Sequence, residues 1–202
     1  GSLPTELAGV QVRFGNHSAP IYHVNNINGQ EFVVVQAPFE LAPGGTVAVT
    51  VTVNGVSTTV TGVEVKAYQP GIFEAIGPAG QRYALLTRLD GTPVTYTSPA
   101  QRGTQLRMIV GGLGQTSPAL GTNSVGVPNQ RVLAPLVVAV NHGGVRVVSA
   151  ETLPGVVGVY VVTFEVPADT TPGQDRSLAI AIANPDGSPS LLRYYSAIAR
   201  LE

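Results

Sequence analysis

The chain has 202 residues, of which 44% are hydrophobic and 11% are charged, and its formal net charge is -1. Its 11 basic and 12 acidic side chains balance without a basic cluster, so nucleic acid and anionic membrane surfaces are excluded as partners. The absence of cysteine excludes disulfides, thiolate catalysis and zinc–cysteine sites. No apolar run approaches the roughly 18 residues of a spanning helix, so we predict no membrane insertion.

Short alternating segments separated by turn residues dominate the first part of the chain. Val10 to Phe14 alternates apolar and polar residues, the period of a half-buried strand, and Gly15-Asn16-His17-Ser18 then forms a turn. Val47 to Val53 alternates in the same way and runs directly into Asn54-Gly55. This dipeptide is the strongest short-range hairpin signal, so the segment from Val56 to Val65 is predicted to return antiparallel.

One sequence unit occurs twice, at Glu31–Val53 and at Val159–Ile182. Each copy runs from an apolar strand into a proline, then meets Pro-Gly five residues later and continues into a second alternating strand. Superposing the two copies pairs apolar positions with apolar positions. We therefore predict that both copies place these residues in a core, with Val33 and Val35 in the first and Val162 and Phe164 in the second.

The signals are weaker from Ile76 to Pro135, and strict alternation resumes at Leu136. Strands are predicted at Tyr83–Leu89, Gln105–Val110, Leu136–Val140, Val145–Ser149 and Leu191–Ala199. Gly111 to Pro128 has no periodicity and is expected to begin a long loop that extends to about residue 135.

These patterns predict an all-β protein made of two tandem immunoglobulin-like β-sandwich modules, because turn signals recur every 8 to 12 residues or so and no capped helical segment is present. The first module is placed at residues 3–68 and the second at residues 76–200. Residues 69–75 contain Pro70-Gly71 flanked by large apolar residues, and we expect them to form a packed linker. Gly1-Ser2 resembles a cleavage scar and Leu201-Glu202 the start of a vector tail, so we expect a piece excised from a longer protein.

Four segments are distinctive: Pro70-Gly71-Ile72-Phe73, Ser98-Pro99-Ala100-Gln101-Arg102-Gly103, Gly112-Leu113-Gly114-Gln115-Thr116-Ser117-Pro118 and the strand Val137–Val140 with its glycine turn. Together they resemble the Solibacter-type C-terminal domain family of acidobacterial secreted and surface proteins. The modules are also similar to immunoglobulin-like domains of the IPT/TIG type. The resemblance implies an extracellular C-terminal appendage, and because the family's function is undefined it assigns no catalytic residue. Asn16-His17 and Asn141-His142 depart from the family, which more often has Asn-Gly or Gly-Gly there.

Few side chains suggest a chemical site. His17, His23 and His142 are too scattered for a local metal motif, and we expect His17 and His142 to occupy equivalent turns of the two copies. Asp169 and Asp175 flank a Pro-Gly connection and could form a weak calcium site, although turn aspartates more often bond to their own backbone. We therefore predict no metal, cofactor or catalytic residue.

Two further motifs have a plain structural interpretation beside a functional one. Gly111-Gly112-Leu113-Gly114 lacks the lysine and helix of a phosphate loop, so close backbone packing is the better interpretation. A strand places the rings of Tyr194 and Tyr195 on opposite faces, where they pack at a core or rim, or form a platform for a sugar.

The leading hypothesis is a non-catalytic structural or adhesive module at the C-terminal end of a larger secreted or surface protein, whose other domains are its expected partners. The alternative is a module that binds a carbohydrate or another surface ligand, with Tyr194 and Tyr195 as the residues to test. A third hypothesis is an enzyme whose site is assembled from dispersed residues around His23 or another base, which would require a closed polar pocket.

Overall fold

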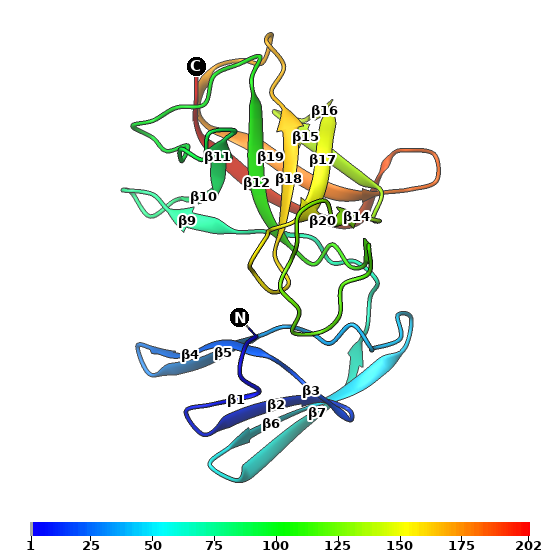
Figure 1. Cartoon of the computed structure of the whole chain (residues 1–202). Helices are drawn as coiled ribbons and strands as arrows, with labels where there is room; N and C mark the ends of the chain where they lie inside the picture. Colours follow the sequence, from blue (N-terminus) through cyan, green and yellow to red (C-terminus); the bar gives the residue numbers. More distant parts are fainter. Residues whose placement is uncertain (1) are drawn as a thin grey trace. The chain divides into compact units, whose positions relative to one another are not determined.

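The computed structural model describes residues 2–202, and within that range the protein is all-β, with twenty strands and no helix (Figure 1). The strands form several antiparallel sheets. The all-β prediction is confirmed.

The chain divides into two compact units, and neither is a continuous segment. Unit 1 contains the chain up to Ala67 together with Ala119–Val127 and Pro154–Gly158. Unit 2 contains Tyr68–Pro118, Pro128–Leu153 and Val159–Glu202. The chain therefore passes from one unit to the other five times.

Unit 1 consists of two small sheets. Its strands are β1 (Glu6–Leu7), β2 (Val10–Phe14), β3 (His17–Ser18), β4 (Ile21–Ile27), β5 (Gln30–Val35), β6 (Thr46–Val53) and β7 (Val56–Glu64). One sheet has the order β1-β2-β6-β7, with β3 also paired to β2, and the other is the β4-β5 hairpin. Asn54 and Gly55 join β6 to β7 with φ of 48° and 84°, which is the geometry that Asn-Gly favours in a tight hairpin. The predicted hairpin is confirmed.

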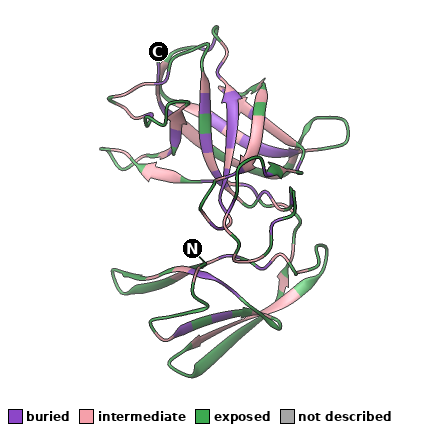
Figure 2. Cartoon of the chain, viewed as in Figure 1, coloured by how far each residue is buried: buried purple, intermediate pink, exposed green. Residues whose placement is uncertain are grey.

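The core of unit 1 is small. Val10, Val12 and Ala19 are buried, and partly buried residues of both sheets pack against them. Val33 and Val35 belong to this partly buried group, so they contact the core without being enclosed by it. Nothing within the described part of unit 1 covers the adjoining face of β7 (Figure 2). On this face Val56 lies opposite Val53 and is 75% exposed, and Val60 lies opposite Val49 and is 59% exposed.

Two segments from elsewhere in the chain, Ala119–Val127 and Pro154–Gly158, complete unit 1. The side chain of Asn123 accepts a hydrogen bond from Leu3 N at 2.7 Å and donates one to Leu3 O at 2.8 Å. The backbone N–H of Asn123 donates to Gln36 Oε1 at 2.8 Å. Thr122 Oγ1 accepts from Phe39 N at 2.7 Å, and the hydroxyl of Tyr22 donates to the carbonyl of Val157. Unit 1 is therefore held together partly by hydrogen bonds between residues that lie more than 80 positions apart in the sequence.

Unit 2 is larger. Its strands are β8 (Gly71–Ile72), β9 (Glu74–Ile76), β10 (Arg82–Ala84), β11 (Leu86–Arg88), β12 (Gln105–Gly111), β13 (Thr116–Ser117), β14 (Arg131–Val132), β15 (Leu136–Val140), β16 (Gly143–Val145), β17 (Val147–Thr152), β18 (Tyr160–Glu165), β19 (Gly173–Ala183) and β20 (Pro189–Leu201). One sheet has the order β11-β12-β18-β17-β14-β13, with β8 also paired to β12, and the second has the order β16-β15-β19-β20. The hairpin β9-β10 forms a third.

The two large sheets of unit 2 share one hydrophobic core. Leu106, Val162 and Phe164 of the first sheet and Ile180 and Ile198 of the second are 0% exposed and belong to the same cluster. Burial of both inner faces against each other is the arrangement of a β-sandwich. Val162 and Phe164 are thus core residues, as predicted from the copied unit.

Strands β15–β20 of unit 2 are paired in the same order as strands β2–β7 of unit 1. In unit 1 the order β3-β2-β6-β7 is accompanied by the hairpin β4-β5, and in unit 2 the order β16-β15-β19-β20 is accompanied by the pair β17-β18. In each copy of the repeated sequence unit, the first strand therefore lies in one sheet and the second strand in the other. The neighbour of β18 on its other edge is β12, whereas β5 pairs only with β4 within residues 2–202, which leaves unit 1 less enclosed.

Several predicted boundaries differ from the structure. Residues 69–75 are not a separate linker, because Gly71 and Ile72 pair with β12 and Ile72 is 5% exposed in the core of unit 2. The loop predicted near 111–135 is shared, since its segment Ala119–Val127 belongs to unit 1. Residues 3–68 and 76–200 therefore do not form two uninterrupted modules.

Two further segments also depart from expectation. Tyr83–Leu89 is not one strand, because the backbone changes partner at Leu85: β10 pairs with β9 and β11 pairs with β12. Leu201, expected to belong to a tail, is the last residue of β20, lies opposite Gly173 and is 1% exposed. Pairing with other strands, which local sequence signals do not specify, decides both cases.

Candidate functional site

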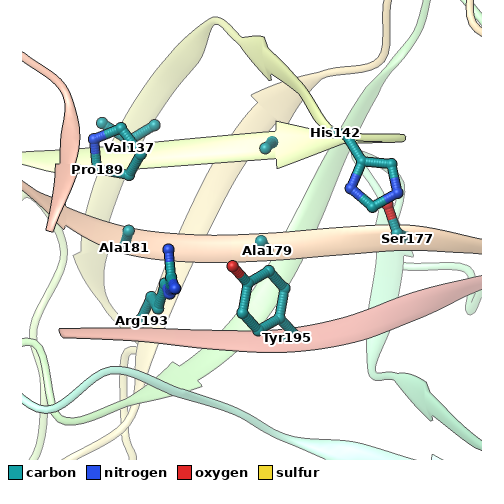
Figure 3. Close-up of a pocket in the computed structure, with 9 residues that line it drawn as sticks. Val137, His142, Ser177, Ala179, Ala181, Pro189, Arg193 and Tyr195 are labelled. Carbon is teal, nitrogen blue, oxygen red and sulfur yellow. The ribbon is translucent and has the colours of Figure 1, made fainter. Parts of the chain in front are cut away.

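The outer face of the β15-β19-β20 sheet contains a hollow of about 160 Å³ (Figure 3). Ala139 of β15, Ala179 of β19 and Tyr195 of β20 are paired neighbours across the strands and form its middle row. Val137, Ala181 and Arg193 form the next row. Directly paired residues lie on the same face of a sheet, so the register alone brings these six side chains together.

Small residues make the floor of the hollow flat. In the middle row the fourth strand contributes Gly144, which lies opposite Ala139, and a side chain built there would meet nothing within 4 Å. With only glycine and alanine across three strands, a ligand can approach the sheet backbone closely. Tyr195 then stands at the edge of this floor as the large side chain of the row.

The two neighbouring tyrosines of β20 have different environments. Tyr195 is 59% exposed and lines the hollow, whereas Tyr194 packs against the core cluster of unit 2. The hydroxyl of Tyr194 donates to Glu74 Oε2 at 3.1 Å, and its pKa is raised by burial and then by this carboxylate. The prediction that the two rings point to opposite faces is confirmed.

Arg193 gives the hollow a positive edge. Its Cζ atom lies 5.4 Å from the centre of the Tyr195 ring, within the range of a cation–π contact. No carboxylate is among the residues that line the hollow. Within residues 2–202, the guanidinium of Arg193 forms no ion pair, in contrast to Arg82, Arg146 and Arg200.

His142 and Ser177 lie at one end of the hollow and Pro189 at the other (Figure 3). Asn141 and His142 form the hairpin loop between β15 and β16 with φ of 50° and 70°, and Asn141 N donates to Ser177 O at 2.8 Å. In the described residues no hydrogen bond joins the side chains of His142 and Ser177. These two groups are therefore placed to contact a ligand, and they are not linked as a nucleophile and its base.

The three histidines do not come together. His17 is the first residue of β3 and pairs with Phe14, so the loop residue equivalent to His142 is Asn16. The predicted equivalence of His17 and His142 is wrong by one position. His23 lies exposed in β4 of unit 1. Across residues 2–202, no group of three or more His, Asp or Glu side chains is arranged to hold a metal ion.

The aspartates differ in how far along the chain their hydrogen-bond partners lie. Asp175 accepts a hydrogen bond from the hydroxyl of Tyr96, and Asp169 lies exposed in the connection before β19. Asp186 accepts from Ser188 N at 2.9 Å and from Ser188 Oγ at 2.6 Å, and these bonds lower its pKa. Asp90 does the same with Thr92. Asp90 and Asp186 therefore bond to the backbone N–H and the hydroxyl two residues later, as turn aspartates ordinarily do.

The glycine-rich segment packs against its neighbouring chain. Gly112 O accepts a hydrogen bond from Gln69 N at 2.8 Å, and a Cβ at Gly112 would lie 1.9 Å from Gln69 O. The carbonyl of Gly114 accepts a bond from the Tyr160 hydroxyl at 2.5 Å. Close backbone packing therefore explains this motif.

Sequence reasoning found Tyr195 but missed Arg193 and the alanine floor. Arg193 lies two residues before Tyr195, so strand periodicity alone puts both on one face. The alanines come from two other strands, and only the pairing register brings them beside Tyr195. No sequence signal marks that register.

Comparison with known proteins gives no match to a protein-family model or to a curated protein. The resemblance to the Solibacter-type family therefore stays a prediction. None of the elements formed by residues 2–202 is a helix of the length and hydropathy needed to cross a bilayer.

Proposed function

We propose that this chain is a structural or adhesive module of a larger secreted or surface protein, and that the outer face of the β15-β19-β20 sheet is its contact surface. The observation that carries the proposal is the hollow in which the exposed ring of Tyr195 stands beside a floor of glycine and alanine. The related strand orders of the two units suit immunoglobulin-like modules, which commonly serve as repeated parts of surface proteins.

The chemistry of this face suits binding to an extended ligand. An aromatic ring with one open face offers apolar contact area together with a polar hydroxyl, a combination enriched at binding surfaces. Beside Tyr195, the middle row presents only Gly144, Ala139 and Ala179, so a ligand needs no rearrangement of the sheet to reach the tyrosine ring. Leu191, 87% exposed on the same strand, lies outside the hollow.

A polysaccharide pull-down with a panel of soluble and insoluble glycans tests the adhesive function. We expect saturable binding that is lost in Tyr195→Ala and kept in Leu191→Ala, a matched control with an exposed residue of the same strand. Circular dichroism and thermal unfolding establish that both variants fold. Absence of binding across the panel, or equal binding by Tyr195→Ala, would overturn the proposal for this face.

The structural side of the proposal depends on how unit 1 is built. Because Asn123 bonds to Leu3 and Val157 bonds to Tyr22, unit 1 draws on chain segments from both sides of the Ala67–Tyr68 boundary. We expect that, after cleavage at a protease site inserted at this boundary, the two fragments remain associated and elute together on gel filtration. Separation of the two fragments without denaturant would show that unit 1 does not need these segments.

A further inference from the structure

We infer that the hollow on the β15-β19-β20 face binds a uronate residue of an acidic polysaccharide. This inference depends on the adhesive function proposed above and names the class of ligand. Three properties of the hollow lead to it: its size, its aromatic wall and its unpaired positive charge.

The size of the hollow suits one six-membered ring. Its volume is about 160 Å³, whereas pockets for drug-sized ligands have about 300–1,000 Å³. A cavity of about 150 Å³ in another protein accommodates benzene, which shows that such a space can hold one ring of six atoms. Because the space above Gly144 is open, the rest of a polymer can continue beyond the hollow.

The wall of the hollow suits the apolar face of a sugar. The face of an aromatic ring is electron-rich, so it attracts the weakly positive C–H groups on one face of a pyranose. Tyr195 supplies such a ring and remains 59% exposed, and Ala139 and Ala179 offer an apolar floor beside it. At the far end, the hydroxyl of Ser177 and the imidazole of His142 can exchange hydrogen bonds with sugar hydroxyls.

The charge of the hollow selects an acidic sugar over a neutral one. Arg193 also lines the hollow, and its Cζ atom lies over the Tyr195 ring, 5.4 Å from the ring centre. A guanidinium pairs with a carboxylate through two parallel hydrogen bonds, and no carboxylate of the lining residues competes for it. Arg193 and Tyr195 both line the hollow, so a carboxylate on a sugar bound there can pair with the guanidinium, and a uronate carries such a carboxylate on its ring.

The test compares oligogalacturonate with its fully methyl-esterified form, which keeps the sugar ring and linkage and removes the negative charge. Each is titrated into the ¹⁵N-labelled full chain and followed by amide chemical shifts. We expect shifts centred on Ala139, Ala179 and Tyr195, with binding of the ester at least about tenfold weaker, the usual cost of losing a charge-assisted hydrogen bond. Arg193→Gln should bind both ligands with the low affinity of the ester, and Leu191→Ala should behave as the unchanged chain.

The outcomes separate this inference from the proposed function. Equal affinity for acid and ester, both dependent on Tyr195, would overturn the uronate inference and support a neutral glycan ligand for the same surface. Shifts outside the β15-β19-β20 face, or no binding of oligogalacturonate, would also overturn the inference. The adhesive function would then be decided by the pull-down with the wider glycan panel.

Discussion

Asn123 provides the sharpest test of how unit 1 is held together. Its side-chain amide forms two reciprocal hydrogen bonds with the backbone of Leu3, 120 residues earlier in the chain. It also adopts φ of 62°, a left-handed conformation that asparagine tolerates better than alanine. Asn123→Ala removes both bonds and places an unfavourable residue in this conformation.

The expected loss follows from these two contributions. A net value of about 1 kcal/mol for each part-buried hydrogen bond gives about 2 kcal/mol for the pair. The left-handed conformation costs alanine about 1 kcal/mol more. Asn123→Ala should therefore lower the free energy of unfolding of unit 1 by about 3 kcal/mol. Asn123→Asp should lose about half the bonding contribution, because a carboxylate can accept from Leu3 N but cannot donate to Leu3 O.

Asn129→Ala is the matched control, since Asn129 has φ of 64° but lies exposed in unit 2. Native-state hydrogen exchange at amides of β2 reads the opening of unit 1, and a loss of 3 kcal/mol accelerates exchange there by about 100-fold. A change below about 0.5 kcal/mol, or one equal to that of Asn129→Ala, would refute the view that this pair stabilises unit 1.

Three further predictions concern single positions. Gly112→Ala should lower the free energy of unfolding, measured by thermal unfolding, by more than about 2 kcal/mol, because its Cβ would lie 1.9 Å from Gln69 O. Gly187→Ala, whose Cβ would meet nothing within 4 Å, should lower it by about 1 kcal/mol. Equal losses for the two variants would contradict the packing argument. Phe164→Ala, at a fully buried site, should cost about 3–5 kcal/mol in urea unfolding, and Val35→Ala, at the matching half-buried site, about 1 kcal/mol; similar costs would contradict the difference in burial. The Asp186 carboxyl should titrate below its ordinary value of 3.8 by NMR and move upward in Ser188→Ala. Because its folded pKa is depressed, its stabilising effect is present above pH 3.8 and is lost as the pH falls through the folded pKa; an unchanged midpoint in Ser188→Ala would contradict this.

Local signals predicted the parts of the fold that depend on neighbouring residues. Alternation of apolar and polar residues identified β2, β6 and β15, and Asn54-Gly55 identified the hairpin between β6 and β7. Both signals are properties of short segments, because the side-chain period and a positive φ involve only neighbouring residues. The same reasoning failed at Leu85, where the strand changes its partner, and at Gly71-Ile72, which becomes part of a sheet. Both outcomes depend on β12, which lies more than 15 residues further along the chain.

The candidate site shows the same division. Strand period was sufficient to separate Tyr194 from Tyr195, since consecutive residues of a strand face opposite sides. Whether Tyr195 would stand at an open floor or under a covering side chain depended on which residues pair with it. Ala179 and Ala139 occupy those positions through the register of three strands, which no short-range pattern specifies.

By itself, the sequence determined that this protein is all-β, where its tight turns lie and which copied segments supply the core of unit 2. The tertiary structure alone decided that Ala119–Val127 and Pro154–Gly158 belong with the first strands, and that β15, β19 and β20 build a hollow around Tyr195. The physical reason is the range of the interactions. Turns and strand faces depend on a few adjacent residues, whereas unit 1 and the hollow depend on hydrogen bonds and strand pairs between distant segments, which form only when the whole chain is folded.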